Sequence, residues 1–242
     1  MRHLLILALL CALPLVAQSE ASQKIVAATD RDAGDQALDG VRKPAHLLDF
    51  LDIKPGSRIA DLGAGGGYTT ELLARAAGPE GKVWAQNPKE WHDFVDADLK
   101  KRFEKDVWKN VVRVDQSFAT PLPEDAKNLD LVVMVLIYHD VCNMMPDRSA
   151  MNKAVFDALK PGGAYVIVDH RAKEGTGTSA GNTIHRIEEK VVHEEVLAAG
   201  FELKAEADFL ADAEDAHDFM AFGRPKQPST DRFVLKFVKP AN

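Results

Sequence analysis

Cysteine is scarce in this chain of 242 residues, which contains only two. Cys11 lies inside an apolar N-terminal run, so Cys142 is the single cysteine in the rest of the chain. A small domain held together by disulfides is therefore excluded. The fold has to be stabilised by a hydrophobic core, and a chain of this length with 46% hydrophobic residues can form one sizeable domain around such a core.

A concentrated run of positive charge is also missing. The formal net charge is −7, and the Lys and Arg residues stand among acidic neighbours. Nucleic-acid binding requires clustered positive charge that replaces the counterions of the phosphates. We therefore expect no nucleic-acid partner. Repeats and low-complexity tracts are absent as well, which leaves an ordinary globular protein.

No apolar run reaches the ~20 residues that a membrane-spanning helix requires. The longest is LLILALLCALPLVA, which follows a basic start, MRH, and precedes a small-residue site at Ser19-Glu20-Ala21. This pattern is typical of a signal peptide. We therefore expect residues 1–21 to be removed and the remainder to be exported, to a bacterial periplasm, without stable membrane insertion.

The remaining sequence divides into a short polar segment and one domain. Residues 22–40 lack sustained periodicity, which predicts a flexible arm, whereas residues 41–242 alternate between apolar strand-like runs and helical patterns. The alternation predicts an α/β fold with a doubly wound, mostly parallel sheet, and the last two strands form an antiparallel hairpin because no helix connects them. The expected strands are residues 58–62, 82–86, 110–114, 131–136, 164–168, 201–207 and 232–238, and the main expected helices are 68–77, 89–107, 147–159 and 187–199.

A glycine-rich loop follows the first expected strand. The sequence DLGAGGGY at residues 61–68 places four glycines between that strand and the start of a helix. Glycines allow the backbone to approach a ligand closely, and the free N–H groups of the helix's first turn point toward it. The dinucleotide pattern G-x-G-x-x-G fails here, because Tyr68 stands where its third glycine would fall.

Together with LKPGG at residues 159–163, this loop resembles the motifs of class I S-adenosylmethionine (SAM)-dependent methyltransferases. The resemblance covers roughly residues 40–240 and implies that family's seven-stranded sheet, SAM as cofactor and methyl transfer as activity. Shorter stretches, YHDV, VDHRA, IHR, DGVRKP and DRFVLKFVKP, resemble a group of predicted exported bacterial methyltransferases. The cofactor-binding residues that the resemblance implies are Asp61, Gly63, Gly65, Gly67, Tyr68, Asn87 and Ser117.

Two of these positions depart from the family's pattern. Asn87 stands at the end of the second strand, where an acidic residue usually accepts hydrogen bonds from the ribose hydroxyls, and an amide makes a weaker bond. Ser117, with Asp115 and Gln116 beside it, stands where an aspartate often contacts adenine. Asp39 and Arg42 precede the first helix of the domain, at the edge where the family commonly covers its cofactor.

Polar tripeptides follow two neighbouring strands of the expected sheet. They are Tyr138-His139-Asp140 and Asp169-His170-Arg171, and His185-Arg186 follows a later glycine-rich loop. Ligands of open α/β sheets bind at the carboxyl ends of the strands, so these side chains should gather where the methyl group is transferred. Histidine, with an ordinary pKa near 6.5, suits the removal of a proton from the methyl acceptor.

We therefore predict that His139 or His170 is the base and that Asp140 or Asp169 orients it. The substrate-binding residues predicted are Tyr138, Arg171, His185 and Arg186, with the arginines holding an anionic group. The sequence thus favours methyl transfer to a small molecule. Two alternatives remain: a non-catalytic binding protein on the same fold, and a metal-dependent enzyme in which His139, Asp140, His170 and His185 supply the ligands.

Overall fold

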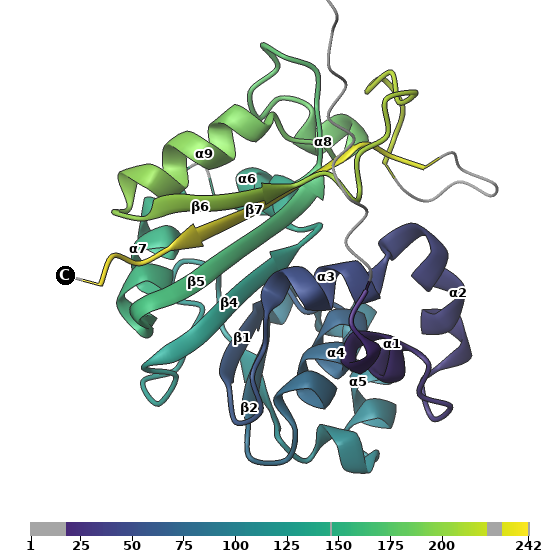
Figure 1. Ribbon diagram of the computed structural model, residues 1–242. Helices are drawn as coiled ribbons and strands as arrows, with labels where there is room; N and C mark the ends of the chain where they lie inside the picture. The colour runs from purple at the N-terminus through teal and green to yellow at the C-terminus, as the bar shows by residue number, and fades with distance from the viewer. Residues whose placement is uncertain (1–17, 146, 222–228, 242) are drawn as a thin grey trace, which may run out of the picture.

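The computed structural model of the chain describes residues 18–145, 147–221 and 229–241. A seven-stranded sheet runs through its centre in the order β3-β2-β1-β4-β5-β7-β6 (Figure 1). The strands are β1 Arg58–Leu62, β2 Lys82–Asn87, β3 Val111–Asp115, β4 Leu129–Val135, β5 Leu159–His170, β6 Glu202–Ala207 and β7 Arg232–Val238.

The strand directions confirm the predicted doubly wound sheet. β1 pairs in parallel with β2 and β4, and the parallel pairing continues to β3 on one side and β5 on the other. β7 is antiparallel to both β5 and β6, so it is the reversed strand of the hairpin expected from the missing crossover helix. The order reverses direction on either side of β1, and a ligand site is expected at the carboxyl end of such a switch point.

Helices cover both faces of this sheet (Figure 1). One face packs against α6, α7 and α9, and the other against α3, α4 and α5. The helices are α1 Glu20–Val26, α2 Ala33–Arg42, α3 Pro44–Leu51, α4 Tyr68–Ala77, α5 His92–Arg102, α6 Tyr138–Met144, α7 Ser149–Ala158, α8 Gly181–Ile184 and α9 Glu189–Ala198, with short 3-10 turns η1 Lys89–Trp91 and η2 Asp106–Trp108.

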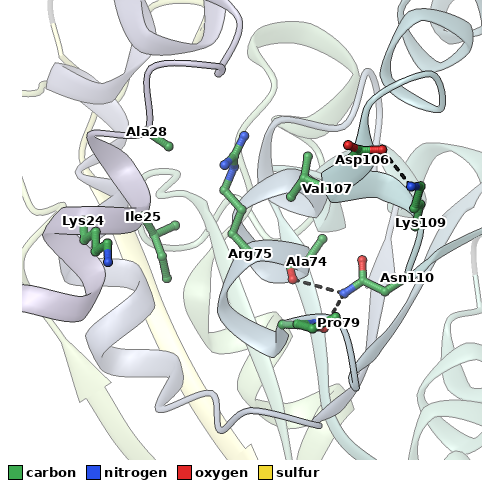
Figure 2. A pocket seen from close by; sticks show the side chains of 11 residues that line it. Lys24, Ile25, Ala28, Ala74, Arg75, Pro79, Asp106, Val107, Lys109 and Asn110 are labelled. Carbon is green, nitrogen blue, oxygen red and sulfur yellow. Dashed lines mark hydrogen bonds and ion pairs between the residues drawn. The ribbon is translucent and has the colours of Figure 1, made fainter.

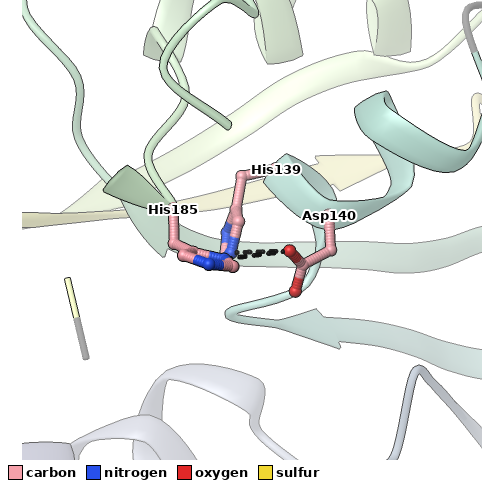
Figure 3. Close-up of side chains that lie close together, drawn as sticks. All are labelled: His139, Asp140 and His185. Carbon is pink, nitrogen blue, oxygen red and sulfur yellow. Dashed lines mark hydrogen bonds and ion pairs between the residues drawn. The ribbon is translucent and has the colours of Figure 1, made fainter. Parts of the chain in front are cut away.

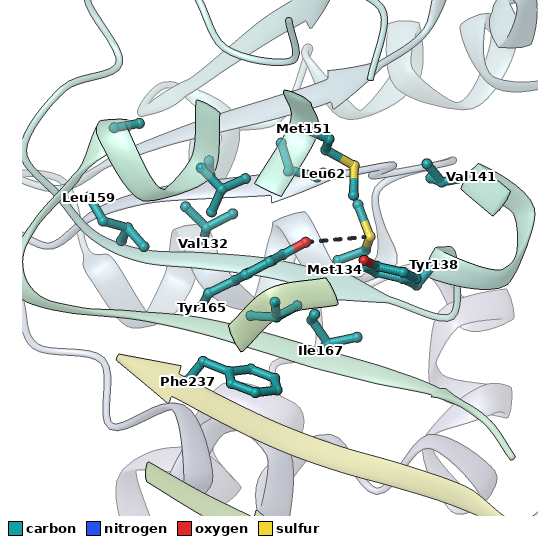
Figure 4. Close-up of a cluster of buried hydrophobic side chains, with 14 of the residues drawn as sticks. Leu62, Val132, Met134, Tyr138, Val141, Met151, Leu159, Tyr165, Ile167 and Phe237 are labelled. Carbon is teal, nitrogen blue, oxygen red and sulfur yellow. Dashed lines mark hydrogen bonds between the residues drawn. The ribbon is translucent and has the colours of Figure 1, made fainter. Parts of the chain in front are cut away.

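Strand β4 explains why the sheet is buried on both sides. Val132 and Met134 face the α7 and α9 layer, whereas Leu131 and Val133 face the α4 and α5 layer. An unbroken apolar run is what a strand covered on both faces requires. In the first layer, Tyr165 lies fully buried among aliphatic side chains and its hydroxyl donates to Met134 Sδ at 3.8 Å (Figure 4).

The N-terminal segment differs from its prediction. Residues 22–40 were expected to form a loose arm, whereas α1 and α2 occupy most of this stretch. Side chains cap both helices: Ser19 accepts from the N–H of Ser22, and Asp32 accepts from the N–H of Gly34. Asp49 of α3 holds α1 from outside, because it accepts hydrogen bonds from the Ser19 hydroxyl at 2.6 Å and the Ser22 hydroxyl at 2.7 Å.

Other boundaries differ less. Strand β5 begins at Leu159, five residues before the expected start, because LKPGG continues the pairing with β4 across a bulge. The expected helix over residues 89–107 is shorter and is flanked by the two 3-10 turns. Residues 1–17 of the predicted signal peptide lie outside the described residues. Within the described part of the chain, no helix combines the length and apolar character needed to cross a bilayer.

Candidate functional site

The glycine loop between β1 and α4 forms the floor of a cavity of about 280 Å³. The cavity lies at the switch point of the sheet, and its size is close to the lower end of small-molecule pockets. Loop residues, the turn after β4 and three helices contribute to its lining: Asp35, Leu38, Arg42, Asp61, Gly63, Ala64, Gly65, Gly66, Tyr68, Thr69, Asp98, Arg102, Val135, Leu136 and Ile137.

Side-chain amides at the end of β2 fix the shape of the loop. Gln86 Oε1 accepts a hydrogen bond from the N–H of Gly63 at 3.0 Å, and Asn87 Oδ1 accepts one from the N–H of Gly65 at 2.8 Å. Asn87 Nδ2 also donates to the carbonyl of Gly65 at 3.1 Å. Asn87 is buried and does not line the cavity, so it braces the loop, whereas the resemblance placed it on the ribose.

The loop glycines do not share one role. Gly63 and Gly65 line the cavity, and a Cβ built on Gly65 meets no atom within 4 Å. Gly67 faces the protein instead, since a Cβ there would lie 2.5 Å from Cη2 of the buried Trp108. Gly67 therefore allows close packing beneath the loop, in addition to the cofactor role that the resemblance implied.

Asp61 is the carboxylate at the bottom of the cavity. Its side chain is buried at the end of β1 and accepts one short hydrogen bond, 2.6 Å from the Thr70 hydroxyl. Burial raises the pKa of Asp61 to about 7, and the hydrogen bond from Thr70 opposes this only in part. A positively charged ligand group beside Asp61 would offset the free-energy cost of burying its charged carboxylate.

Arg42 supplies a positive charge to the same cavity. It is the last residue of α2, and its guanidinium stacks over the Tyr68 ring with 4.4 Å to the centroid. No described residue forms a hydrogen bond or ion pair with the Arg42 guanidinium, and burial lowers its pKa. The Tyr68 hydroxyl donates to Asp39 at 2.7 Å, and Asp39 also pairs with Arg31 at 2.6 Å, which fixes α2 over the loop.

Helices α2 and α5 contribute cavity residues that the sequence did not single out. Asp35 and Leu38 come from α2, and Asp98 lies exposed at the rim on α5. Arg102 of α5 forms ion pairs with Asp35 at 2.8 Å and with the buried Glu71 at 2.9 Å, so it ties α2 and α5 to α4. The sequence placed Asp98 and Arg102 in a charged helical stretch, residues 89–107, and placed Asp35 and Leu38 in the expected flexible arm.

Ser117 lies apart from the cavity. It is exposed beyond the end of β3 and is not among the described residues that line the hollow.

The turn after β4 connects the cavity to the predicted histidine cluster. Val135, Leu136 and Ile137 line the cavity, and α6 begins with Tyr138 immediately afterwards. Leu136 has φ 61°, a left-handed conformation that is strained for a branched side chain. This turn aims the first residues of α6 across the end of the sheet toward β5.

His139, Asp140 and His185 lie together at that point, and their polar atoms converge (Figure 3). Asp140 Oδ1 is 3.4 Å from His139 Nε2 and 3.1 Å from His185 Nδ1. On its other side, His139 Nδ1 is 2.7 Å from Asp169 Oδ1, and its backbone N–H donates to Asp169 Oδ2 at 2.9 Å. The contact of Nδ1 with the buried Asp169 fixes the ring of His139, and the contact of the backbone N–H fixes the first turn of α6 beside it.

The two candidate bases have opposite pKa shifts. Burial alone would lower the pKa of His139, but the neighbouring Asp169 and Asp140 raise it to about 10. Burial, with the charges of His139 and Arg232, lowers the pKa of His170 to about 2. His170 is thus neutral near pH 7, and its Nδ1 is 2.9 Å from the Thr230 hydroxyl. The sequence prediction had assumed an ordinary pKa for both.

Three predicted substrate residues are engaged elsewhere. Tyr138 is fully buried, donates to Glu195 at 2.7 Å and accepts from Asn152 at 2.9 Å. Arg186 is fully buried and pairs with Asp215 at 2.8 Å. Arg171 pairs with Asp231 at 2.9 Å, and it also contacts Glu189. None of the three lines the loop cavity, so their contacts support the fold around the cluster.

Another hollow, of about 510 Å³, lies between α1, the end of α4 and η2 (Figure 2). Ile25, Ala74 and Val107 form part of its wall. None of the predicted site residues, all of which the structure describes, lines it. The smaller loop cavity is the better candidate site, because the glycine loop lines it and it lies at the switch point of the sheet.

Parts of the sequence are similar to known proteins. A family model described as a methyltransferase domain matches residues 60–167. The chain is 33% identical over 154 residues to fibrillarin 3 of Arabidopsis thaliana, covering 62% of this chain and 48% of that protein. It is 29% identical over 124 residues to the protein-L-isoaspartate O-methyltransferase of Aeropyrum pernix, covering 50% and 42%. The chain spans about half the length of the curated relatives it matches.

A solved structure has the same fold over most of its length. The SAM-dependent methyltransferase from Aquifex aeolicus superimposes with a TM-score of 0.61 at 18% identity, covering 84% of this chain and 93% of that chain. The glycine loop, the sheet order and this likeness agree, and the predicted fold is confirmed.

Proposed function

We propose that this chain transfers the methyl group of SAM to a small-molecule acceptor; the methyltransferase-domain model that matches residues 60–167 and the shared fold support this. When bound, SAM supplies a methyl group activated by a sulfonium. The acceptor offers an oxygen, nitrogen or sulfur atom as nucleophile. No Asn/Asp-Pro-Pro-aromatic motif follows β4, where the sequence is IYHDV, which weighs against amino groups of adenine or glutamine as the acceptor.

The charges of the cavity fit the amino-acid end of SAM. Asp61 is a buried carboxylate, and the Thr70 hydroxyl is its one hydrogen-bond donor among the side chains that the structure describes, so it suits the ammonium group. Arg42, which has no partner of opposite charge within hydrogen-bond distance among the described residues, suits the carboxylate. Asp98 at the rim is a carboxylate for the ribose hydroxyls, in place of Asn87, which braces the loop. Because Gly65 has no side chain and no atom lies within 4 Å of its Cβ position, SAM can approach the backbone closely there.

The acceptor binds on the side of the turn after β4. Ile137 lines the cavity, and His139 and Asp140 follow it within three residues. We propose that this cluster positions the acceptor and receives its proton, and that Asp169 holds the imidazole ring in place. Because the pKa of His139 is raised to about 10, its imidazole is protonated near pH 7, so we propose that it receives the proton in its neutral form, which alkaline pH favours; His170 is neutral near pH 7, but its lowered pKa makes it a weak proton acceptor.

The observation that carries the proposal is the pair of opposite charges, Asp61 and Arg42, that line one cavity without forming an ion pair with each other. Calorimetry of the purified chain with SAM and with its demethylated product tests it directly. We expect both to bind, and Arg42→Met to weaken SAM binding by about 10- to 100-fold, the worth of a charge-assisted hydrogen bond.

The adjacent Lys43→Met is the matched control, because Lys43 is exposed and donates to the Phe209 carbonyl outside the cavity. It should leave the affinity unchanged. An absence of heat and of thermal stabilisation with both compounds would contradict the proposal. Binding of both without methyl transfer to any hydroxyl, amine or thiol acceptor would favour a non-catalytic binding protein.

The place of action is a separate proposal. Because MRH and the apolar run that follows are typical of a signal peptide, we propose that the domain works after export, in the periplasm. SAM is made in the cytoplasm, so the exported enzyme would depend on delivery of its methyl donor. Fractionation of cells that produce the full chain, with detection of the domain in each compartment, tests this directly.

A further inference from the structure

The buried histidine of the cluster has an unsatisfied nitrogen. His139 is fully buried, and its Nε2 makes no well-formed hydrogen bond with a described residue, since Asp140 Oδ1 lies in a long contact at 3.4 Å. Its Nδ1 faces Asp169, so Asp169 fixes the ring and leaves Nε2 directed toward Asp140 and His185. A buried polar atom without a well-formed hydrogen bond costs about 1–3 kcal/mol, and a bound ion is one of the arrangements that satisfy such an atom.

We propose that His139, Asp140 and His185 bind one divalent transition-metal ion, with Asp169 as the outer carboxylate that orients His139. One ligand atom from each of the three residues lies within 4.8 Å of the other two. The contacts of Asp140 Oδ1 with the two imidazoles are 3.4 Å and 3.1 Å. Ligands about 2.0–2.1 Å from a common ion lie roughly 3.0–3.4 Å apart, so both contacts of Asp140 already have this spacing, and the two imidazole nitrogens, within 4.8 Å of each other, would have to approach at most by about 1–2 Å.

The donor set indicates the kind of ion. Two imidazoles and one carboxylate suit Zn²⁺ or Fe²⁺, whereas Mg²⁺ and Ca²⁺ prefer oxygen ligands. A histidine ligand that passes its other N–H to a carboxylate is the usual arrangement in metal sites, and Asp169 supplies that carboxylate at 2.7 Å. Three protein ligands leave a coordination position open, as in catalytic zinc sites.

Access to the site is from the side of Asp140 and His185. Both side chains are 27% exposed, whereas His139 and Asp169 are fully covered. The backbone brings His185 to this point at a cost: it ends α8 with φ 54° and ψ 55°, a left-handed conformation. Helix α8 also packs against α6 so closely that a Cβ on Gly181 would lie 2.8 Å from the His139 carbonyl oxygen.

An ion at this position would replace His139 as the direct proton acceptor, and this use of the site rests on the proposed methyl transfer. An acceptor hydroxyl or thiol bound at the open position has a lowered pKa and loses its proton to solvent. The resulting anion forms the new bond to the methyl carbon, and the carbon–sulfur bond breaks with its electron pair remaining on sulfur.

Metal binding is measured without any methyl transfer. The chain is freed of metal by a chelator and titrated with Co²⁺, whose visible absorption reports its ligands, and with Zn²⁺ in competition with a coloured chelator. We expect one equivalent to bind. Asp140→Asn and His185→Ala should each weaken binding at least 100-fold, and Asp169→Asn by 10- to 100-fold.

The matched control is His193→Ala. His193 belongs to the group Glu189, His193 and Glu206, which also brings three possible ligands together, though at a more exposed place. Binding that is lost in this variant and retained in Asp140→Asn and His185→Ala would overturn the proposal. An absence of saturable Co²⁺ and Zn²⁺ binding would overturn it as well.

Calorimetry with SAM on the same samples separates the two proposals. SAM binding without metal binding would refute the metal site alone. Metal binding that Asp140→Asn and His185→Ala abolish, in a chain that does not bind SAM, would support the metal site and contradict the proposed function.

Discussion

Replacing Gly67 by alanine should damage the protein in a different way from replacing Gly65, two positions away. Both glycines have positive φ, +91° at Gly67 and +55° at Gly65, so alanine is strained at either position. The surroundings differ. A Cβ on Gly67 would lie 2.5 Å and 2.9 Å from two ring atoms of Trp108, whereas a Cβ on Gly65 would meet nothing within 4 Å.

The expected cost at Gly67 has two parts. The left-handed conformation costs about 1–2 kcal/mol for any residue with a Cβ. Trp108 is 1% exposed and packs edge-on against Phe103 at 5.1 Å, so it can move only by disturbing the layer beneath the loop. Overpacking of this kind costs about 1–3 kcal/mol. We expect Gly67→Ala to lower the free energy of unfolding by about 2–5 kcal/mol in total.

At Gly65 the expected loss of stability is only the conformational part, about 1–2 kcal/mol. Its added methyl group would instead occupy space in the cavity, and we expect it to weaken SAM binding at least 10-fold, or about 1.4 kcal/mol. Urea denaturation of both variants gives the first quantity, and calorimetry with SAM gives the second. The loop therefore predicts a large stability loss at Gly67 and a large affinity loss at Gly65.

Equal stability losses in the two variants would refute the argument, because strain at positive φ would then account for everything. An unchanged SAM affinity in Gly65→Ala would show that the cofactor does not approach this face of the loop. Partial unfolding of Gly67→Ala at the assay temperature would lower its apparent affinity for SAM. Calorimetry of this variant is therefore done at a temperature where circular dichroism shows that it is folded.

Two further predictions concern charged groups near the cavity. Burial raises the pKa of Asp61 to about 7, so its carboxyl is protonated in the free protein at pH 5 and must lose that proton to pair with an ammonium group. The dissociation constant for SAM should therefore rise by up to about tenfold per pH unit below 7. Calorimetric titrations of Asp61→Asn should show no such dependence on pH. Arg102→Met removes the ion-pair partner of the buried Asp35, whereas Glu71 keeps Arg75 at 2.8 Å, so urea denaturation should show a loss of about 1–3 kcal/mol in the free energy of unfolding. The exposed neighbour Lys101→Met should change it by less than about 0.5 kcal/mol, and similar values for both would contradict the assigned network.

The sheet could be predicted because its signals are local. The apolar run of β4 and the glycines that precede and follow α4 are read from neighbouring residues, and α4 has the bounds that were expected, Tyr68–Ala77. The start of β5 was predicted wrongly, because Lys160-Pro161-Gly162-Gly163 resembles a stop signal. Its pairing with Leu129 across a bulge is a contact between distant parts of the chain.

The N-terminal helices could not be predicted for the same physical reason. Helix α1 has no extended apolar face, and it depends on caps and on the hydrogen bonds that Asp49 accepts some thirty residues away. Helix α2 is held by the pairing of Asp35 with Arg102. Short helices gain most of their stability from tertiary contacts, and periodicity in one segment does not report such contacts.

The arginines show where prediction of the site succeeds and where it fails. Arg186 resembled a substrate ligand in the sequence, yet Asp215 neutralises it, and Arg171 likewise has Asp231. Arg42 was noted only for its place at the edge of the domain, and it is the one of the three that lines the loop cavity without such a partner. What separates a binding arginine from a structural one is therefore the supply of opposite charge from other parts of the chain.

The same reasoning explains why the cavity should favour a ligand with both charges. Asp61 and Arg42 each carry the cost of burial, and the structure gives neither a partner of opposite charge within hydrogen-bond distance among the described residues. A ligand that brings an ammonium group and a carboxylate would satisfy both at once, and these two new interactions would offset the cost of burying the two charges and add to the affinity. A ligand with only one of these charges would leave the other residue unsatisfied. Homocysteine-like and methionine-like amino acids should thus bind this cavity better than adenosine does, even though adenosine has the larger surface to bury.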